Sequence, residues 1–285
     1  MRVLSLFDGI ACGRVALERA GVPVDSYFAS EIDPHCITVA KQNHRDIEHI
    51  GDVRGIDDAK VAELGKIDLL LAGSPCQGFS RASAMSGTRT GMQHERSGLY
   101  TEFLRVFNLV KPRYFLLENV IMKEEYVQRI SDDLGVRPMP IDSALFSAQR
   151  RPRLYWTNIG VAPLPPKDSS TLRSILVPRE DVPRNYYLSP RAIEYMERKK
   201  GGRPRWRSYQ NRLDDKSACV TAVCHKGAPY GVVWDLKRRL CPVELERLQT
   251  LPDDYTSGVA ATHRLKSVGN GWTVDVIAHI LHGLV

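Results

Sequence analysis

The sequence has few cysteines, and their spacing does not define a metal or disulfide site. Six cysteines occur among 285 residues, at positions 12, 36, 76, 219, 224 and 241. None form a CxxC pair, and no cluster of His and Cys has the spacing of zinc ligands, so we expect no metal site. The spacing does not indicate a disulfide framework either. We therefore expect reduced thiols in a cytoplasmic compartment.

Long apolar runs, internal repeats and low-complexity segments are also missing. The segment "MRVLSLFDG" is apolar only briefly and is interrupted by Asp8, which argues against a secretory signal. The segment "VDVIAHILHGLV" is too short and too polar to cross a bilayer. We therefore expect no membrane partner. The formal net charge of +7 is compatible with a polyanionic partner, but simple solubility explains it equally well.

The sequence does contain alternating strand and helix patterns. Hydrophobic residues make up 43% of the chain and charged residues 26%, which is a globular composition. Apolar runs with small or acidic residues at or near their ends, each followed by helical spacing, are "VLSLF", "SYFAS", "IDLLLAGSP" and "YFLLENV", and "IEHIGDV" fits a further strand. The clearest helical face is Leu99, Phe103, Val106, Phe107 and Val110. This alternation predicts an α/β fold with a parallel sheet covered on both faces.

The pattern changes after about Asn158. A proline-rich link, "GVAPLPPKDSS", leads into an irregular, basic and aromatic region whose extreme is "RKKGGRPRWRSYQNR". Apolar periodicity returns in "VELERLQTL" and "TVDVIAHILHGL". We expect a catalytic domain over residues 1–159 and 263–285, and a smaller domain over residues 160–262. The basic stretch predicts phosphate contacts, with a solvated loop as the alternative.

Polar or reactive residues end or follow five of the predicted strands. They are Asp8, Glu31, Asp52, Cys76 and Glu118. Ligands of open α/β sheets bind beyond the carboxyl ends of the strands, so we expect these residues at one site. Glu31 has the position of an acidic residue that binds two ribose hydroxyls. Asp52 suits an adenine amino group or, equally, a turn cap.

The first strand-helix connection, "FDGIACG", contains Gly9 and Gly13, which permit a tight turn close to a ligand. It is not a GxGxxG motif, so a dinucleotide is not indicated.

Three further residue types suggest catalysis. Cys76 lies between Pro75 and Gln77-Gly78 at the predicted end of a strand, where a thiolate can act as a nucleophile. Glu118 suits a carboxyl group that hydrogen-bonds a reacting ring. Strand alternation would place Arg151 and Arg153 on one face, where two guanidinium groups suit phosphate or carbonyl oxygens. Taken singly, these residues also fit a buried thiol, a solvated carboxylate and a solvated basic strand.

Together these segments resemble the DNA cytosine-5 methyltransferases. "FDGIACG", "SEID" and "GDVR" look like the cofactor motifs, "GSPCQGFS" like the nucleophile motif, "ENV" like the glutamate motif and "QRRPR" like the Arg-x-Arg motif. "RRLCPVELERLQTLPDDY" and "VGNGWTVDV" look like the two late motifs. Eight motifs in the family's order are highly specific. "FDGIACG" and Trp272 look more like the eukaryotic de novo enzymes, while "PCQGFS" looks bacterial, and a standalone bacterial or phage enzyme is expected.

The resemblance implies a Rossmann-like S-adenosylmethionine-dependent methyltransferase domain with a smaller target-recognition domain. It implies methylation of carbon 5 of cytosine in double-stranded DNA by attack of Cys76 on a flipped base, with S-adenosylhomocysteine as product. It assigns Glu118, Arg151 and Arg153 to catalysis. It assigns the cofactor site to Phe7, Asp8, Gly9, Ile10, Ala11, Cys12, Gly13, Glu31, Ile32, Asp52, Val53, Ser74, Pro75, Leu99, Asn270, Gly271 and Trp272.

Two alternatives stay open at this point. A transfer-RNA cytosine methyltransferase would share the fold, although the sizeable basic segment favours DNA. A catalytically silent DNA-binding relative would lack the reaction, although the presence of Cys76, Glu118 and Arg153 argues against it. We expect a monomer associated with the nucleoid of a bacterial or phage-infected cell, and a cognate restriction endonuclease is a further candidate partner.

Overall fold

The computed structural model describes residues 1–73, 98–200, 202–204, 211–228 and 230–285, which pack into two compact units. The first unit comprises Met1–Ile141, Pro152–Pro163 and Ile277–Val285, and the second comprises Asp142–Arg151 and Leu164–Val276. Among the helices of these residues, none combines the length and the hydropathy needed to span a membrane.

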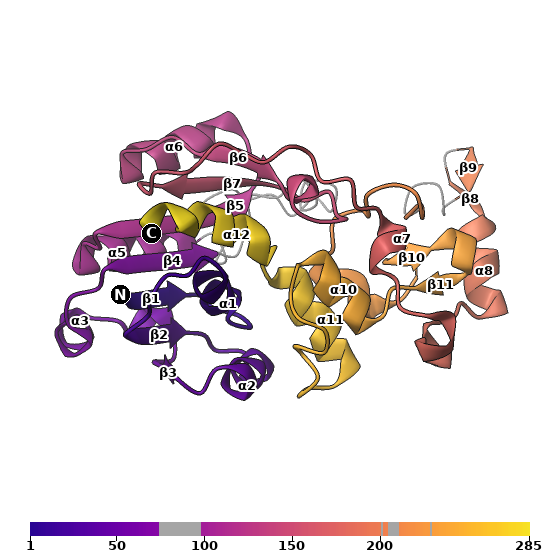
Figure 1. Ribbon diagram of the computed structural model, residues 1–285, viewed down its shortest axis with the longest axis horizontal. Coiled ribbons are helices and arrows are strands. Elements are labelled where there is room, and N and C mark those ends of the chain that lie inside the picture. Colours follow the sequence, from indigo (N-terminus) through magenta and orange to yellow (C-terminus); the bar gives the residue numbers. More distant parts are fainter. Residues whose placement is uncertain (74–97, 201, 205–210, 229) are drawn as a thin grey trace. The chain divides into compact units, whose positions relative to one another are not determined.

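The first unit is built around a seven-stranded sheet in the order β3-β2-β1-β4-β5-β7-β6 (Figure 1). Its elements are β1 (Arg2–Leu6), α1 (Cys12–Arg19), β2 (Ser26–Ser30), α2 (Pro34–Asn43), β3 (Ile47–His49), the 3-10 turn η1 (Val53–Gly55), α3 (Asp58–Leu64), β4 (Leu69–Gly73), α5 (Gly98–Val110), β5 (Tyr114–Val120), α6 (Glu124–Leu134), β6 (Met139–Asp142), β7 (Pro152–Thr157) and η8 (His282–Leu284). Helix α12 (Val274–Leu281) begins in the second unit and belongs to the first from Ile277 onward. The predicted strand-helix alternation, including the extra strand at "IEHIGDV", is confirmed.

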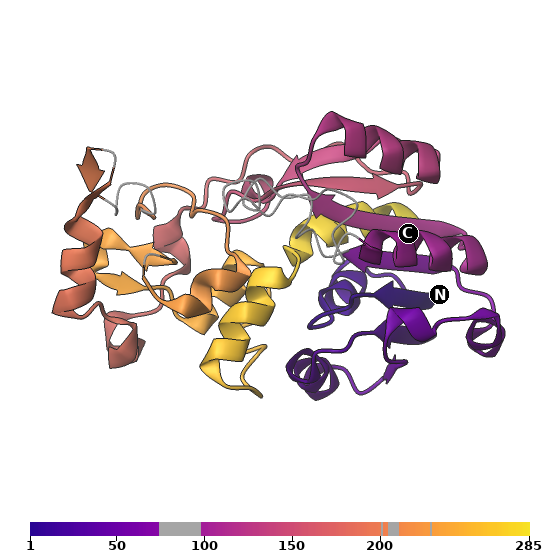
Figure 2. The same cartoon turned by 180° about the vertical axis from the view of Figure 1, so that it is seen from behind.

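The sheet is covered on both faces. One face packs against α3, α5 and α6 in a core that includes Leu4, Leu70 and Leu117 of the strands and Phe103 and Ile130 of the helices. Figures 1 and 2 show α1 and α12 on the opposite face. Strand β4 is apolar throughout and buried because both of its faces are covered.

The prediction of a parallel sheet is confirmed for the five strands on which it was based, β1 to β5, and β7 adds an antiparallel strand that it did not include. Strands β3, β2, β1, β4 and β5 pair in parallel, whereas β7 pairs antiparallel with β5. Between β6 and β7 the chain has only residues 143–151, which contain one short 3-10 turn, η3 (Ser143–Leu145). Parallel strands need a crossover of about a dozen residues or more, so this short link does not return the chain to a parallel position.

The second unit consists of short elements. They are α7 (Leu172–Ile175), η4 (Arg179–Asp181), η5 (Arg184–Tyr186), α8 (Pro190–Glu197), β8 (Lys199–Lys200), β9 (Arg203–Pro204), η6 (Ala222–Lys226), β10 (Val232–Val233), η7 (Trp234–Leu236), β11 (Arg238–Arg239), α10 (Pro242–Leu248) and α11 (Ala261–Asn270). A buried ion pair joins β11 to α10: both guanidinium Nη atoms of Arg238 contact the carboxylate of Glu244, at 2.7 and 2.8 Å. Helix α11 packs so tightly on η6 that a Cβ on Gly269 would lie 2.3 Å from the carbonyl carbon of Thr221.

Candidate active site

The turn between β1 and α1 has an unusual backbone. Phe7, Gly9 and Ala11 all have positive φ, at 56°, 61° and 62°. Non-glycine residues rarely adopt this region, and they do so mainly at turns and functional sites. Ile10, Ala11 and Cys12 are buried as whole residues, so this part of the turn packs into the first unit, and its assignment to the cofactor site stays a prediction.

Glu31, directly after β2, is tied to this turn. Its Oε1 accepts the backbone N–H groups of Ile32 and Asp33, each at 2.8 Å, and its Oε2 accepts the N–H of Gly9 at 2.8 Å. A carboxylate has about four acceptor positions, so Oε2 retains capacity for a hydroxyl donor. The neighbouring Ile32 is an exposed large apolar side chain, 68% accessible. A polar acceptor beside an apolar surface fits the ribose and the base of a nucleoside.

Asp52, after β3, opens η1. Its Oδ1 accepts the N–H of Arg54 at 3.0 Å, and its side chain is 42% exposed. The capping interpretation of Asp52 is therefore correct, and its other oxygen, Oδ2, lies 3.5 Å from Nη1 of Arg54 in a partly exposed ion pair. Val53, by contrast, is buried in the core of the first unit, so its predicted contact with a cofactor finds no support in this geometry.

Three of the predicted residues lie outside the described part of the chain. They are Ser74, Pro75 and the nucleophile candidate Cys76. The last described residue before them, Gly73, ends β4, and its Cα is paired with that of Glu118 on β5. The sequence therefore brings Cys76 three residues beyond a position adjacent to Glu118. Leu99, at the start of α5, is partly buried against the core.

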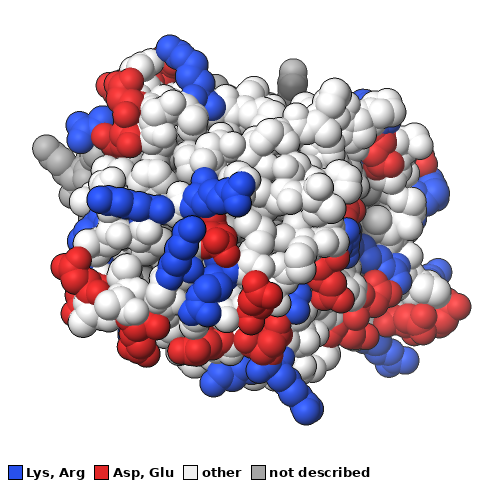
Figure 3. All heavy atoms as spheres, turned by 60° about the vertical axis from the view of Figure 1, so that its left-hand side comes forward, with Lys and Arg blue, Asp and Glu red and all other residues white. Residues whose placement is uncertain are grey.

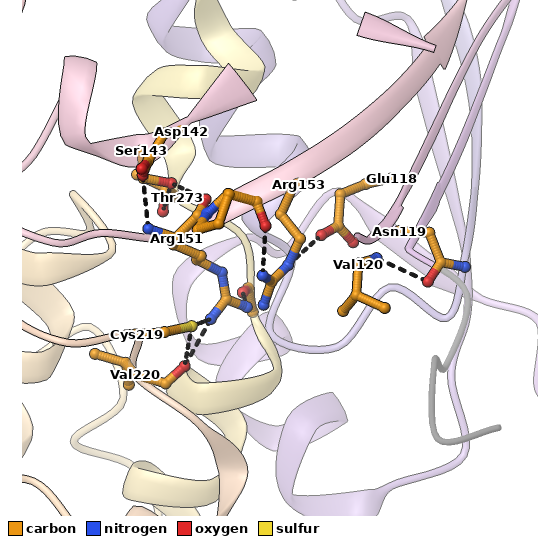
Figure 4. Close-up of polar contacts among 12 residues, drawn as sticks. Glu118, Asn119, Val120, Asp142, Ser143, Arg151, Arg153, Cys219, Val220 and Thr273 are labelled. Atoms are coloured by element: carbon orange, nitrogen blue, oxygen red, sulfur yellow. Dashed lines mark hydrogen bonds and ion pairs between the residues drawn. The ribbon is translucent and has the colours of Figure 1, made fainter. Parts of the chain in front are cut away.

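Glu118 and Arg153 come together across β5 and β7. Glu118 Oε1 lies 2.9 Å from Arg153 Nε, and the two side chains are 11% and 14% exposed. Figure 4 shows the two side chains pointing toward one another. The antiparallel register places Arg153 opposite Val120 and Glu118 opposite Tyr155, so the pair is diagonal. The structure thus unites two of the residues that the sequence assigns to catalysis.

Arg151 has different surroundings. The expectation that it shares a strand face with Arg153 is wrong, because β7 begins at Pro152 and Arg151 belongs to the second unit. Arg151 is 4% exposed. Its guanidinium donates to the carbonyl oxygens of Val220 at 2.6 Å and Gly271 at 2.8 Å (Figure 4). It holds backbone in place within its own unit.

The buried side-chain amides of Gln149 and Gln249 hydrogen-bond each other beside Arg151, and neither residue was predicted to belong to the site. Gln249 donates through Nε2 to the carbonyls of Val268 and Gly271, both at 3.0 Å, and accepts at Oε1 from Gln149 and Thr273, at 2.9 and 2.8 Å. All four hydrogen-bonding positions of this amide are used. The network anchors the segment that carries Asn270, Gly271 and Trp272. Its one sequence signal is a glutamine inside the apolar run "VELERLQTL".

Asp8 is the most perturbed titratable group of the carboxyl edge. Its Oδ1 accepts the hydroxyl of Tyr27 at 2.6 Å, whereas its Oδ2 is buried without a hydrogen-bond partner. Burial raises the pKa of the Asp8 carboxyl to about 6, with a further contribution from the negative charge of Glu31, and the hydrogen bonds from Ser5 and Tyr27 oppose the rise. Because Oδ2 is buried and Oδ1 is bound to Tyr27, the Asp8 side chain supports the turn from the protein interior.

Known proteins are similar to this chain over most of its length. The model of the C-5 cytosine-specific DNA methylase family matches residues 1–126 and 166–285. The chain is 28% identical to the type II methyltransferase M.NlaX of Neisseria lactamica over 304 residues, covering 98% of this chain and 94% of that protein. It is 27% identical to the type II methyltransferase M1.ScrFI of Lactococcus lactis subsp. cremoris, covering 97% and 76%.

The fold comparison agrees. The crystal structure of the Dnmt2 methyltransferase of S. pombe superimposes with a TM-score of 0.73 and 19% identity, covering 99% of this chain and 97% of that one. At this identity the match supports the fold alone. The family match covers both ends of the chain and the carboxyl-edge residues of β1 to β5. The chain therefore belongs to the C-5 cytosine-specific DNA methylase family and is a DNA cytosine-5 methyltransferase.

Proposed function

We propose that this enzyme takes the methyl group from S-adenosylmethionine and transfers it to a flipped cytosine of duplex DNA, with Cys76 as covalent nucleophile. The observation that carries the proposal is the Glu118–Arg153 pair. It places a carboxylate on β5, the neighbour of the strand that leads to Cys76, and a guanidinium 2.9 Å away on β7, which pairs with β5. A cytosine ring has N3 and an exocyclic amine, which suit a carboxyl group, and an O2 carbonyl, which suits a guanidinium.

The carboxyl edge of the first unit fits the proposed cofactor. The remaining acceptor capacity of Glu31 Oε2 suits a ribose hydroxyl, the exposed Ile32 suits the face of a purine, and Asp52 suits the adenine amino group. These residues follow β2 and β3, which are neighbours in the sheet. S-adenosylmethionine, when bound, supplies an electrophilic methyl group. By family resemblance Phe7, Leu99 and the segment Asn270–Trp272 also contribute to its binding.

The chain's own residues account for the activation of the base. Carbon 5 of cytosine is a weak nucleophile, and a bond from the Cys76 thiolate to carbon 6 moves the ring electrons to carbon 5. Glu118 would hold N3 and the exocyclic amine, and Arg153 would hold the O2 carbonyl, so that charge developing on the ring is stabilised. After carbon 5 has been methylated, a base removes its proton, the ring double bond re-forms and the thiolate leaves.

The remaining assignments concern DNA. A base within a duplex is inaccessible to a thiolate, so the cytosine must be extruded at a cost of a few kcal/mol. We assign recognition to residues 160–262, in particular to the basic stretch from Arg198 to Arg212, part of which lies outside the described residues. On the face drawn in Figure 3, basic and acidic side chains are interspersed, so this face is not a continuous basic patch.

The experiment is base-resolution mapping of 5-methylcytosine in DNA from cells that express the enzyme, with Cys76→Ala as control. The proposal expects methylation within one short sequence, lost in the variant. In parallel, the purified enzyme receives methyl-labelled S-adenosylmethionine with duplex DNA or with transfer RNA. Label in transfer RNA alone would overturn the DNA assignment, and label in neither would support a silent relative.

A binding measurement tests the cofactor site separately. Glu31→Ala removes the carboxylate that would accept the ribose hydroxyls, and a hydrogen bond to a charged group is worth about 1.5–3 kcal/mol. Calorimetry should show an affinity for S-adenosylmethionine about ten- to a hundredfold lower than that of the wild type. Unchanged affinity would remove Glu31 from the site.

A further inference from the structure

Arg105, on helix α5, donates hydrogen bonds to backbone carbonyls of the turn that Asp52 caps. Its Nη2 donates to the carbonyl oxygen of Val53 at 2.9 Å, and its Nη1 donates to that of Ile56 at 2.5 Å. Helix α5 packs against η1, the turn to which Val53 belongs. The guanidinium therefore links the carbonyl of Val53, the first residue of η1, to that of Ile56, the residue that follows η1.

The position of Arg105 is itself fixed. Glu102, one turn earlier on α5, accepts from Arg105 Nε at 2.9 Å and from Nη2 at 2.8 Å. On the same helix Tyr100, Phe103 and Val106 are buried in the core of the first unit. The arginine side chain is 35% exposed, so it lies at the rim of that core with its planar donor group aimed at the turn.

The turn is held at both ends. At its beginning the Asp52 carboxylate accepts from Arg54 N, and the Asp52 carbonyl accepts from Gly55 N at 3.0 Å. At its end the Val53 carbonyl accepts from Ile56 N at 3.2 Å as well as from Arg105. Val53 and Ile56 are 3% and 1% exposed. Removal of Arg105 would leave the carbonyl of Val53 with one hydrogen-bond donor fewer. Val53 directly follows Asp52, the residue proposed to bind the adenine amino group.

We infer that Arg105 is a positioning residue that fixes the Asp52 turn and thereby gives the cofactor site its selectivity for adenine. The inference rests on the proposed function, in which Asp52 accepts a hydrogen bond from the adenine amino group. A carboxylate discriminates an amino group from a carbonyl oxygen only if it is held at hydrogen-bonding distance and angle. Arg105 supplies this constraint from α5.

A general stabilising role makes a different prediction. If Arg105 only connects α5 to η1, its loss would weaken binding of every nucleoside cofactor by the same factor. If it positions Asp52, its loss would change the ratio of affinities for two cofactors that differ only at the adenine amino group. S-adenosylhomocysteine and S-inosylhomocysteine are such a pair, since inosine has a carbonyl oxygen in place of the amino group.

The test measures both dissociation constants by calorimetry for the wild type and for Asp52→Ala, Arg105→Met and Arg105→Lys. The wild type should prefer the adenosine compound about ten- to a hundredfold. Asp52→Ala should reduce the preference to less than about threefold, and Arg105→Met should reduce it to nearly the same value. Arg105→Lys retains the charge and one donor group, so an intermediate preference is expected, and this variant serves if Arg105→Met does not fold.

The matched control is Arg2→Met. Arg2 also caps a carbonyl in the first unit, with Nη2 2.5 Å from the oxygen of Leu64, but it lies at the start of β1, where its side chain also contacts Ser26 and Phe28. Its loss should lower stability and leave the preference unchanged. If the Arg105 variants keep the wild-type preference while Asp52→Ala loses it, the inference is overturned and the proposed cofactor site stands. If the wild type has no preference, the role of Asp52 fails, and the inference fails with it.

Discussion

Glu118 and Arg153 are held side by side by two antiparallel strands, with Glu118 Oε1 2.9 Å from Arg153 Nε. Both side chains are largely buried at the strand ends, where an ion pair is costly unless its remaining groups bind something. The proposed function assigns this pair to the cytosine ring, and the rates of its variants test that assignment.

The first prediction concerns this pair. Glu118→Gln should lower the rate of methylation at saturating cofactor by about 10²–10⁴-fold, because an amide cannot stabilise the charge on the ring as a carboxyl group does. Arg153→Lys should lower it by about 10²–10³-fold, because lysine lacks the planar donor group. Single-turnover kinetics measure both. Arg129→Lys, in the exposed pair with Asp133, is the control and should retain the wild-type rate.

Several of these features follow from the sequence, and the reasons for the exceptions are physical. Strands β1, β2, β4 and β5 are mostly buried and largely apolar, and Glu31 and Asp52 follow strands, so both the fold and this edge could be predicted. The antiparallel β7 depends on the shortness of the link from β6. Arg151 was misplaced because alternation was counted from a strand that begins one residue later. The contact of Gln149 with Gln249 joins residues 100 positions apart, which no local pattern indicates.

Arg105 illustrates a different limit. On a helical projection it is a charged residue flanking the apolar face, and such residues are commonly solvated. Its function depends on backbone carbonyls of a turn that precedes it by about 50 residues. Only the packing of α5 on η1 shows which acceptors it reaches.

The second prediction follows from the buried carboxyl group of Asp8. Burial raises its pKa from the ordinary 3.8 to about 6, so the folded state binds the proton more tightly than the unfolded state. The corresponding stability is fully present below about pH 4 and is lost as the pH rises through about 6. Asp8→Asn, which is uncharged and retains an acceptor for Tyr27, should therefore be more stable than the wild type at pH 8, by at most about 3 kcal/mol. At pH 4 the two should be equal.

Urea unfolding at the two pH values measures this difference. A gain in stability that is the same at pH 4 and pH 8 would show that the carboxyl group of Asp8 does not titrate as described.

The third prediction concerns the buried ion pair of the second unit. Glu244 is fully buried, and its carboxylate also accepts the backbone N–H of Cys241 at 2.9 Å and of Val177 at 3.1 Å. Glu244→Ala should destabilise the protein by about 3–5 kcal/mol, because Arg238 is left as an unpaired buried charge. The double variant Glu244→Leu/Arg238→Met should recover part of this loss. Denaturant unfolding of the single and double variants measures the coupling, and strictly additive effects would contradict it.

The fourth prediction concerns the close approach of η8 to residue 160. A Cβ on Gly283 would lie 2.0 Å from the carbonyl oxygen of Gly160, so Gly283→Ala should destabilise the first unit by about 1–3 kcal/mol. Among the residues that the structure describes, none lies within 4 Å of a Cβ added to Gly98, at the start of α5. Gly98→Ala is therefore the control and should be neutral or slightly stabilising in the same thermal unfolding experiment.

The central claim is that Cys76 forms a covalent bond to carbon 6 of the target cytosine. Release of the enzyme requires loss of the proton on carbon 5, and fluorine at that carbon cannot leave as a proton does. Duplex DNA with 5-fluorocytosine at a position already shown to be methylated should therefore trap the wild type in the presence of S-adenosylmethionine. The measurement is denaturing electrophoresis of this mixture. The account predicts a stable protein–DNA adduct for the wild type and none for folded Cys76→Ala, and an adduct or methylation by that variant would contradict it.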